Sequence, residues 1–253
     1  MASHKRKIIA LIIIVVLLAL WEVSVRAFSI KEYLLPAPSA IMQVLVAQSS
    51  GLIQDLLYTT AESLIGFLIA VVFSFIFAVF FAHSRVLYDS TMPFLIALKA
   101  VPIVAMAPLL VLWMGNGFIS KATMSAVICF FPIVVNLTKG LTSIPDEHVR
   151  LMRSLSASWW QVLLKIRLPN SMPFFFAALK IASTLSVVGA IVAEFSGANK
   201  GIGYVILVAA LRIETPMLFC GIFLASLLGI ILYYSIEFAE KKLIYWEESD
   251  VII

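Results

Sequence analysis

Two acidic residues, Glu62 and Glu194, lie inside long apolar stretches of the sequence, where an ionised side chain is costly if the stretch crosses a membrane. Such residues usually line a transport pathway or pair with a neighbouring group, so both are candidates for function. Glu62 could line a gate or could sit at the membrane surface. Glu194 could line a pathway or could pair with Lys200, Arg212 or a backbone amide. Two further polar residues are pathway candidates that could also hydrogen-bond between helices, Asn136 and Ser186.

The residue patterns of common catalytic and metal sites are missing from the sequence. It contains neither the G-x-x-x-x-G-K-[ST] loop that binds ATP phosphates nor the H-E-x-x-H pair of a zinc site. His4, His83 and His148 stand at no spacing typical of metal ligands, and no Ser–His or Cys–His nucleophile pair can be argued. We therefore expect neither catalysis nor a bound cofactor or metal in this chain. A membrane-embedded enzyme stays open as an alternative, and so does a stand-alone channel or proton-coupled carrier.

The composition indicates a protein that crosses the membrane several times. Hydrophobic residues make up 62% of the 253 residues and charged residues only 13%, and the mean hydropathy is +1.08. A soluble helical bundle has too little interior to hide so much apolar surface. The net charge of +4 does not indicate a nucleic-acid partner, because the basic residues cluster beside the apolar stretches. Cys129 and Cys220 lie within such stretches and are expected as small buried residues, without a disulfide.

Six apolar segments are long enough to span a bilayer, which takes about 20 residues. They are Ile8–Phe28, Thr59–Ala82, Pro93–Met114, Ile119–Thr138, Pro173–Phe195 and Met217–Ile236. The first could instead be a signal peptide, but no small-x-small cleavage site follows it. Glu22 and Arg26 stand four residues apart near its end and can pair there. The run Ile202–Leu211 is too short to cross and is expected to pack on the outer side of the bundle.

The basic residues predict the orientation of these segments. With six spans and the N-terminus inside, only Lys31, Lys200 and Arg212 face outward. Eleven fall on the cytoplasmic side: Lys5, Arg6, Lys7, Arg85, Lys139, Arg150, Arg153, Lys165, Arg167, Lys241 and Lys242. Because cytoplasmic loops carry the excess of Lys and Arg, both termini are expected in the cytoplasm.

Proline and glycine residues predict where these segments bend or turn. Pro102, Pro108 and Pro132 lack an amide donor and can kink their helices. Met114–Gly117 has the composition of a tight turn and is expected to join the third and fourth spans on the outer side.

The longest cytoplasmic segment, Thr138–Met172, begins with the pattern of a short amphipathic helix. Ser143 can cap this helix, and Asp146 then lies near its positive end. Helical spacing places three apolar side chains on one face of it, Leu151, Met152 and Leu155.

A second short helix is predicted after residue 157. Ser158 and Gln161 have the spacing of a capping box, and an apolar stripe follows, with Trp159, Trp160, Leu163 and Leu164. Pro169 is expected to end this helix, because Leu168 before it is pushed away from helical geometry. The two helices could lie on the bilayer surface, pack on their own bundle, or present an apolar face to a cytoplasmic partner.

The loop resembles a signature of the permeases of binding-protein-dependent ABC importers, which has the form E-A-A, three residues, G, nine residues, I-x-L-P. Ile166, Leu168 and Pro169 match its end. The glycine position falls on Ser156, and the E-A-A positions fall on Arg150, Leu151 and Met152. Arg150 reverses the charge of the usual Glu, which suggests an adapted ATPase partner, and a serine at residue 156 can cap a helix and keep the turn.

Other stretches resemble one branch of these permeases, which includes those for nitrate, taurine, alkane sulfonates and thiamine precursors. They are LLPAPSAI (Leu34–Ile41), SLIGF (Ser63–Phe67), VPIVAMAPLLVLWMGNGFISK (Val101–Lys121), VVGAIVAEF (Val187–Phe195) and KGIGYVI (Lys200–Ile206). The resemblance extends from about Leu34 to Trp246, and Glu194 also resembles a position of the family.

The resemblance implies a fold and a mechanism. It implies an all-α permease similar to the MetI-like fold, with one domain over residues 1–253 and six transmembrane helices, in the cytoplasmic (inner) membrane of a prokaryote. Two copies, expected to be identical, would form a central pathway. A periplasmic or lipid-anchored binding protein would deliver the substrate, and separate ATPase subunits would bind ATP and Mg.

The loop at about residues 143–169 would dock in a groove on the ATPase. The residues implied in this coupling are Arg150, Leu151, Met152, Arg153, Leu155, Ser156, Ala157, Trp160, Ile166, Leu168 and Pro169. Trp159 could instead face the bundle or the lipid surface.

Overall fold

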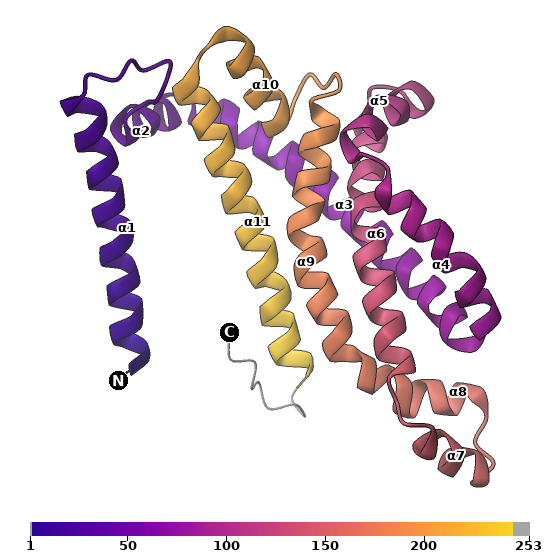
Figure 1. Ribbon diagram of the computed structural model, residues 1–253. Helices are drawn as coiled ribbons and strands as arrows, with labels where there is room; N and C mark the ends of the chain where they lie inside the picture. The colour runs from indigo at the N-terminus through magenta and orange to yellow at the C-terminus, as the bar shows by residue number, and fades with distance from the viewer. Residues whose placement is uncertain (1, 245–253) are drawn as a thin grey trace.

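The computed structural model describes residues 2–244, which form an all-helical bundle (Figure 1). Residues 1 and 245–253 lie outside the described part, and so does the expected end of the family resemblance at Trp246. The long helices run between two ends of the bundle. One end carries the short helices α7 and α8, and the other carries α2 and α10 (Figure 1).

In the described part of the chain, four helices are long and apolar enough to cross a membrane. They are α3 (Ser49–His83), α6 (Phe118–Thr142), the helix Trp159–Glu194 that contains α9 (Leu168–Glu194), and α11 (Thr215–Leu243). The first predicted span falls on α1 (Ala2–Ala27), a single helix of 26 residues. At a rise of 1.5 Å per residue it is about 39 Å long.

The third predicted span is a broken helix. It falls on α4 (Arg85–Ala100) and α5 (Ile103–Met114), which are separated by Val101 and Pro102. The break follows from the proline, which has no amide donor and disfavours helical geometry in the residue before it. Pro108 and Pro132, in contrast, lie inside continuous helices. Residues 115–117 form the predicted turn between α5 and α6, with Gly115 at a φ of 80°.

The centre of the bundle is a close crossing of α3, α6 and α9. At this three-helix crossing Gly66 of α3 and Gly189 of α9 both meet Ser125 of α6. A Cβ atom at Gly66 would lie 2.4 Å from the Ala122 carbonyl oxygen and 2.5 Å from Ser125 Cβ, and one at Gly189 would lie 2.7 Å from Ser125 Cα. Small residues thus let three backbones approach closely, which is a common way for membrane helices to pack.

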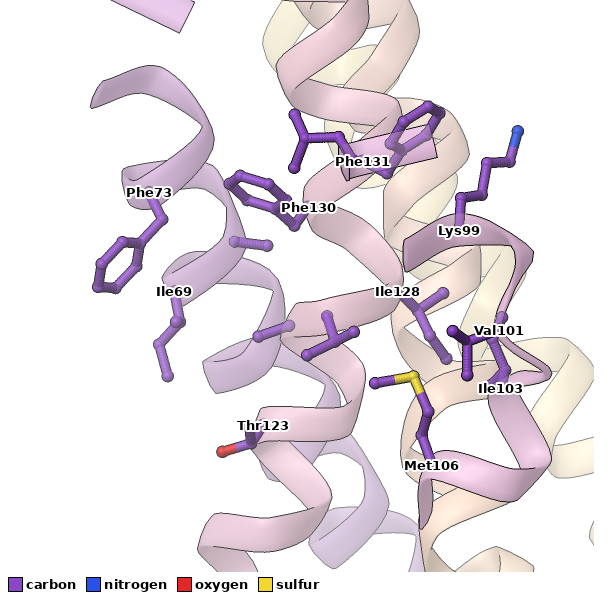
Figure 2. A pocket seen from close by; sticks show the side chains of 14 residues that line it. Ile69, Phe73, Lys99, Val101, Ile103, Met106, Thr123, Ile128, Phe130 and Phe131 are labelled. Atoms are coloured by element: carbon purple, nitrogen blue, oxygen red, sulfur yellow. The ribbon is translucent and has the colours of Figure 1, made fainter. Parts of the chain in front are cut away.

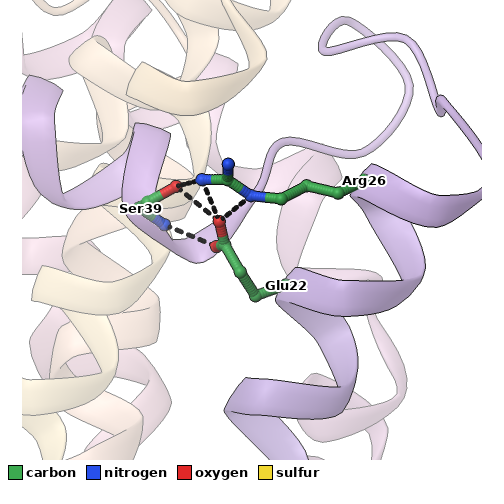
Figure 3. A network of polar contacts seen from close by, with 3 residues as sticks. All are labelled: Glu22, Arg26 and Ser39. Atoms are coloured by element: carbon green, nitrogen blue, oxygen red, sulfur yellow. Dashed lines mark hydrogen bonds and ion pairs between the residues drawn. The ribbon is translucent and has the colours of Figure 1, made fainter.

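Polar contacts attach α1 to the start of α2 (Pro38–Ala47) (Figure 3). Arg26 Nε donates to Glu22 Oε1 over 2.6 Å, so the predicted pair of these two residues is confirmed. The same carboxylate accepts from the Ser39 hydroxyl at 2.8 Å and from the Ser39 amide at 3.0 Å. Because Ser39 lies in the first turn of α2, Glu22 supplies a partner for an amide that the helix itself leaves free.

The short apolar run after residue 201 forms α10 (Ile202–Arg212), which packs against α9 and α11 as predicted. It ends at Ile213, which has a φ of 60° and is therefore left-handed. A β-branched residue rarely adopts that conformation.

Candidate functional site

The predicted coupling loop protrudes from one end of the bundle (Figure 1). It consists of α7 (Asp146–Ser154), α8 (Trp159–Val162) and a π-helical turn, η1 (Leu163–Arg167), that leads into α9. Three large apolar side chains on it are exposed to solvent: Leu151 is 60% exposed, Leu155 is 71% exposed and Trp160 is 62% exposed. We call these three residues the loop knob. Of the other predicted coupling residues, Arg150, Arg153 and Ser156 are exposed, whereas Met152, Ala157, Ile166, Leu168 and Pro169 are half-buried.

The corner between the two helices is a Schellman motif. The amide of Ser156 donates to the Arg153 carbonyl at 2.9 Å, and the amide of Ala157 donates to the Met152 carbonyl at 3.0 Å. Ser156 has a φ of 60°, the left-handed conformation that this motif requires at its corner. The family signature has glycine at this position, and glycine adopts such a φ without a steric cost. The turn is therefore kept in this chain, but by a serine held in an unfavourable conformation.

The capping box of the second helix is confirmed. The Ser158 amide donates to Gln161 Oε1 at 2.7 Å, and the Gln161 amide donates to Ser158 Oγ at 3.3 Å. The two tryptophans that follow pack edge to face against each other, with ring centroids 4.8 Å apart, but differ in their other surroundings. Trp159 packs against His83 of α3, with ring centroids 4.7 Å apart, whereas Trp160 belongs to the exposed knob. The first tryptophan thus attaches α8 to the bundle and leaves the second free for contact.

The prediction that Ser143 caps the first helix is wrong. Ser143 has a φ of −78° and a ψ of 0° and ends α6, and the residue that precedes α7 is Pro145. The Ser143 hydroxyl donates to the Gly140 carbonyl at 3.0 Å and accepts from Asn170 Nδ2 at 2.9 Å. The hydroxyl thus joins the end of α6 to the start of α9, and it does not start a new helix. Asp146 does lie in the first turn of α7, as expected.

The prediction that Pro169 ends the second helix is also wrong. Leu168 is helical, with a φ of −66° and a ψ of −50°, and its amide donates to the Leu163 carbonyl five residues back. This wide turn lets the chain enter α9 with Pro169 in the first turn, where a missing amide leaves no helical bond unmade. Arg167 supports the junction, because its guanidinium donates to the Ala82 carbonyl near the end of α3 at 2.7 Å.

Glu194 lies at the opposite end of the bundle, where its side chain is fully buried. Its carboxylate accepts from the Thr59 hydroxyl at 2.7 Å and from the Gly203 amide at 2.5 Å. Thr59 Oγ1 in turn accepts from the Ile202 amide at 2.8 Å. Of the alternatives for Glu194, the pairing with a backbone amide is confirmed. Together Thr59 and Glu194 bind the first amides of α10, which carry the positive end of that helix.

Glu62 is buried, with only 4% of its surface exposed, and it is close to Glu194. Its Oε2 atom has no hydrogen-bond partner in the described part of the chain. Lys121 is buried in the same region and donates to Asn116 Oδ1, while Asn116 Nδ2 donates to the Gly197 carbonyl. We refer to Thr59, Glu62, Lys121 and Glu194 as the buried polar cluster.

The side chains of Asn136 and Ser186 do not hydrogen-bond between helices as predicted. Asn136 Nδ2 donates to the Pro132 carbonyl, and Ser186 Oγ donates to the Ser183 carbonyl, each within its own helix. A bond between helices does form at residue 186, but through its carbonyl, which accepts from Ser125 Oγ at 2.8 Å. In each case a local carbonyl lies one helical turn away and competes with any partner on another helix.

Sequence reasoning missed Thr59, Asn116 and Arg167. A threonine at the start of an apolar run resembles many others, and its role depends on a carboxylate 135 residues further along the chain. Asn116 lies between two glycines and was interpreted only as a turn residue. Arg167 lies inside the family signature, at the position that accepts any residue.

The family model for the inner membrane component of binding-protein-dependent transport systems matches residues 63–245. The chain belongs to this family. The predicted resemblance is thereby confirmed, and the protein is a membrane permease of an ABC transporter.

A probable ABC transporter permease from Haemophilus influenzae is 33% identical over 235 residues, which cover 93% of this permease and 96% of the relative. A formylaminopyrimidine transport permease from Halalkalibacterium halodurans is 32% identical over 234 residues, 92% of this chain and 93% of that one. Permeases named for aliphatic sulfonates and for taurine are also similar, as the predicted branch requires.

The fold resembles a chain of the methionine ABC transporter MetNI in its inward-facing conformations. The TM-score is 0.62 at 17% sequence identity, and the match covers 79% of this permease and 97% of that chain. This confirms the predicted MetI-like fold.

Proposed function

We propose that this permease forms the substrate pathway of an ABC importer together with a second copy of itself. In this proposal a binding protein delivers the substrate from outside, and separate ATPase subunits bind ATP and Mg and engage the loop at residues 143–169. The observation that carries the coupling role is the loop knob, because three large apolar side chains face solvent on a frame that is anchored to the bundle. Exposed apolar patches of this kind are typical of protein interaction sites.

The geometry favours an ATPase partner over the two other interpretations of the loop. Packing on the permease itself does not account for Leu151, Leu155 and Trp160, which the bundle leaves more than half exposed. If the loop lay on the bilayer surface, its apolar face would be directed toward the lipid around the ends of the long helices. Instead, α7 extends beyond those ends (Figure 1).

Substitution of the knob tests this role. Leu155→Asp would bury an unpaired charge in a groove, and Trp160→Ala would remove an anchor, so each should weaken ATPase binding by about 2 kcal/mol or more, roughly 30-fold. Val86→Asp is the matched control, because Val86 is 76% exposed and lies outside the loop. The measurement is ATPase retained on the purified permease. Wild-type retention and transport in both knob variants would show that the loop is not the coupling element.

We propose six spans with both termini in the cytoplasm. The support is the excess of basic residues on one side and the alternating direction of α1, α3, the α4–α5 pair, α6, α9 and α11 (Figure 1). An impermeant thiol reagent added outside should label a cysteine placed at Asn199 and should miss one placed at Ser156. Labelling at Ser156 from outside would reverse the orientation.

The proposed assembly has two copies of this chain, because one copy could enclose only part of a pathway. Native mass measurement of the purified complex should show two permease chains and two ATPase subunits. A transporting complex with a single permease chain would contradict the proposal. Because relatives are named for formylaminopyrimidine and for taurine, we propose a small organic molecule as the substrate.

A further inference from the structure

A cavity of about 460 Å³ lies between α3, α6 and the broken helix α4–α5 (Figure 2). Its volume is within the range of sites that bind small organic molecules. The walls are almost entirely apolar and rich in aromatic rings, with Phe73, Phe130, Phe131, Met106 and Ile128 among them. Only two of its lining residues have polar side chains, Lys99 and Thr123.

Lys99 is a charged residue at an unusual depth. It lies in the last turn of α4, and its Nζ atom is 4.9 Å from the centre of the Phe131 ring (Figure 2). Phe131 is in the middle of α6, a helix long enough to cross a membrane. The break after Ala100 therefore places the exposed Lys99 ammonium beside the middle of a helix that is long enough to span a membrane.

A charge at this depth needs a partner. Attraction to the face of Phe131 offsets part of its cost. None of the ion pairs in the described part of the chain involves Lys99. A lipid phosphate would be a poor partner, because headgroups lie about 15 Å from the middle of the hydrocarbon layer. Charged groups inside the membrane that face a cavity generally mark a substrate pathway.

We propose that this cavity binds a small organic anion with a flat apolar body during import. The anionic group pairs with the Lys99 ammonium, and the body lies among Phe130, Phe131 and Met106. The inference rests on the proposed import function, because it places the cavity on the pathway that the substrate follows through the permease.

A photoreactive aromatic anion, benzophenone-4-carboxylate, tests the site on the permease–ATPase complex in lipid nanodiscs. Its methyl ester has the same shape and no charge. After irradiation, mass spectrometry should find the carboxylate attached at Met106. Lys99→Met should lower this labelling about tenfold, which corresponds to about 1.4 kcal/mol, and Lys99→Arg should largely preserve it. The ester should label wild type and Lys99→Met alike, which shows that the variant is folded. Lys31→Met, at an exposed lysine that does not line the cavity, is the control.

Two results would overturn the site. One is an absence of carboxylate labelling at Met106 in the wild-type complex. The other is equal carboxylate labelling of wild type and Lys99→Met, as expected for a lipid-filled pocket that admits any apolar molecule. ATPase retention, measured in the same samples, separates this outcome from a failure of the proposed function. If the complex keeps its ATPase but its labelling does not depend on Lys99, only the proposed site is refuted. If the wild-type permease binds no ATPase, the proposed function is refuted.

Discussion

The three-helix crossing makes a quantitative prediction about Gly66. An added methyl group would lie 2.4 Å from the Ala122 carbonyl oxygen and 2.5 Å from Ser125 Cβ. Carbon atoms in contact are normally about 3.5–4.0 Å apart, so α3 and α6 would have to separate by about 1 Å. Overpacking of this kind costs about 1–3 kcal/mol.

Gly51 provides a matched control in the same helix. It also lies in α3, and apart from its chain neighbours and the backbone of its own helix, no atom of the described residues is within 4 Å of the Cβ that an alanine would add there. Because Gly51 lies in the first turn of α3, Gly51→Ala should stabilise the helix by no more than about 0.5–1 kcal/mol, the gain for alanine over glycine in a helix interior. Gly66→Ala, in the interior of the same helix, gains at least as much from alanine, so the difference between the two variants is a lower estimate of the clash and should be up to about 3 kcal/mol.

Equilibrium unfolding of the purified permease in mixed detergent micelles, followed by tryptophan fluorescence, measures this difference. Gly66→Ala should unfold at a lower denaturant concentration than wild type, and Gly51→Ala at a slightly higher one. If both variants unfold together, α3 and α6 do not pack as closely as the structure shows, and the reasoning fails.

Substitutions at four further positions test local geometry. Ser156→Gly should stabilise the loop corner by up to about 1 kcal/mol and Ser156→Val should destabilise it, because the φ of 60° suits glycine. Amide hydrogen exchange across α7 measures both effects, and the opposite order of stability would contradict the left-handed corner. Ser158→Ala should cost about 1 kcal/mol and speed exchange in α8, since it removes the capping hydroxyl. Thr59→Val should cost about 1–3 kcal/mol and raise exchange at the start of α10, where unchanged protection would argue against the bond to Ile202. Ile213→Gly should raise the melting temperature by relieving a left-handed β-branched residue, and a lower value would refute that assignment.

Features that depend on neighbours in the sequence could be predicted. The apolar runs located the long helices because a spanning segment needs about 20 apolar residues in a row. The capping box at Ser158 could also be recognised, since its two partners are three residues apart. The start of α3 at Ser49, ten residues before the predicted Thr59, could not, because its polar first turns fall outside the apolar run.

Features that depend on distant residues could not be derived in this way. Ser143 has the local pattern of a cap, but Asn170 binds its hydroxyl and joins it to another helix. Pro169 normally stops a helix, but the wide turn before it lets the chain continue. The burial of Glu62 beside Glu194 depends on how α3 crosses α9, and nothing in either segment alone records that crossing. The contact of Lys99 with Phe131 likewise joins residues on two different helices.

The π-helical turn has a mechanical consequence. Because η1 runs directly into α9, no slack linker separates the protruding loop from a helix that crosses the whole bundle. If α9 turns as a rigid rod about the three-helix crossing near Gly189, the 21 residues from Leu168 to Gly189 form a lever arm of about 32 Å. A rotation of about 5° around that point displaces the Leu168 end by about 3 Å. Conversely, a displacement of a few ångströms at the loop moves the far end of α9 by only a fraction of that distance, because that end lies much closer to the crossing. Glu194 and the first amides of α10 are attached to this end and move with it.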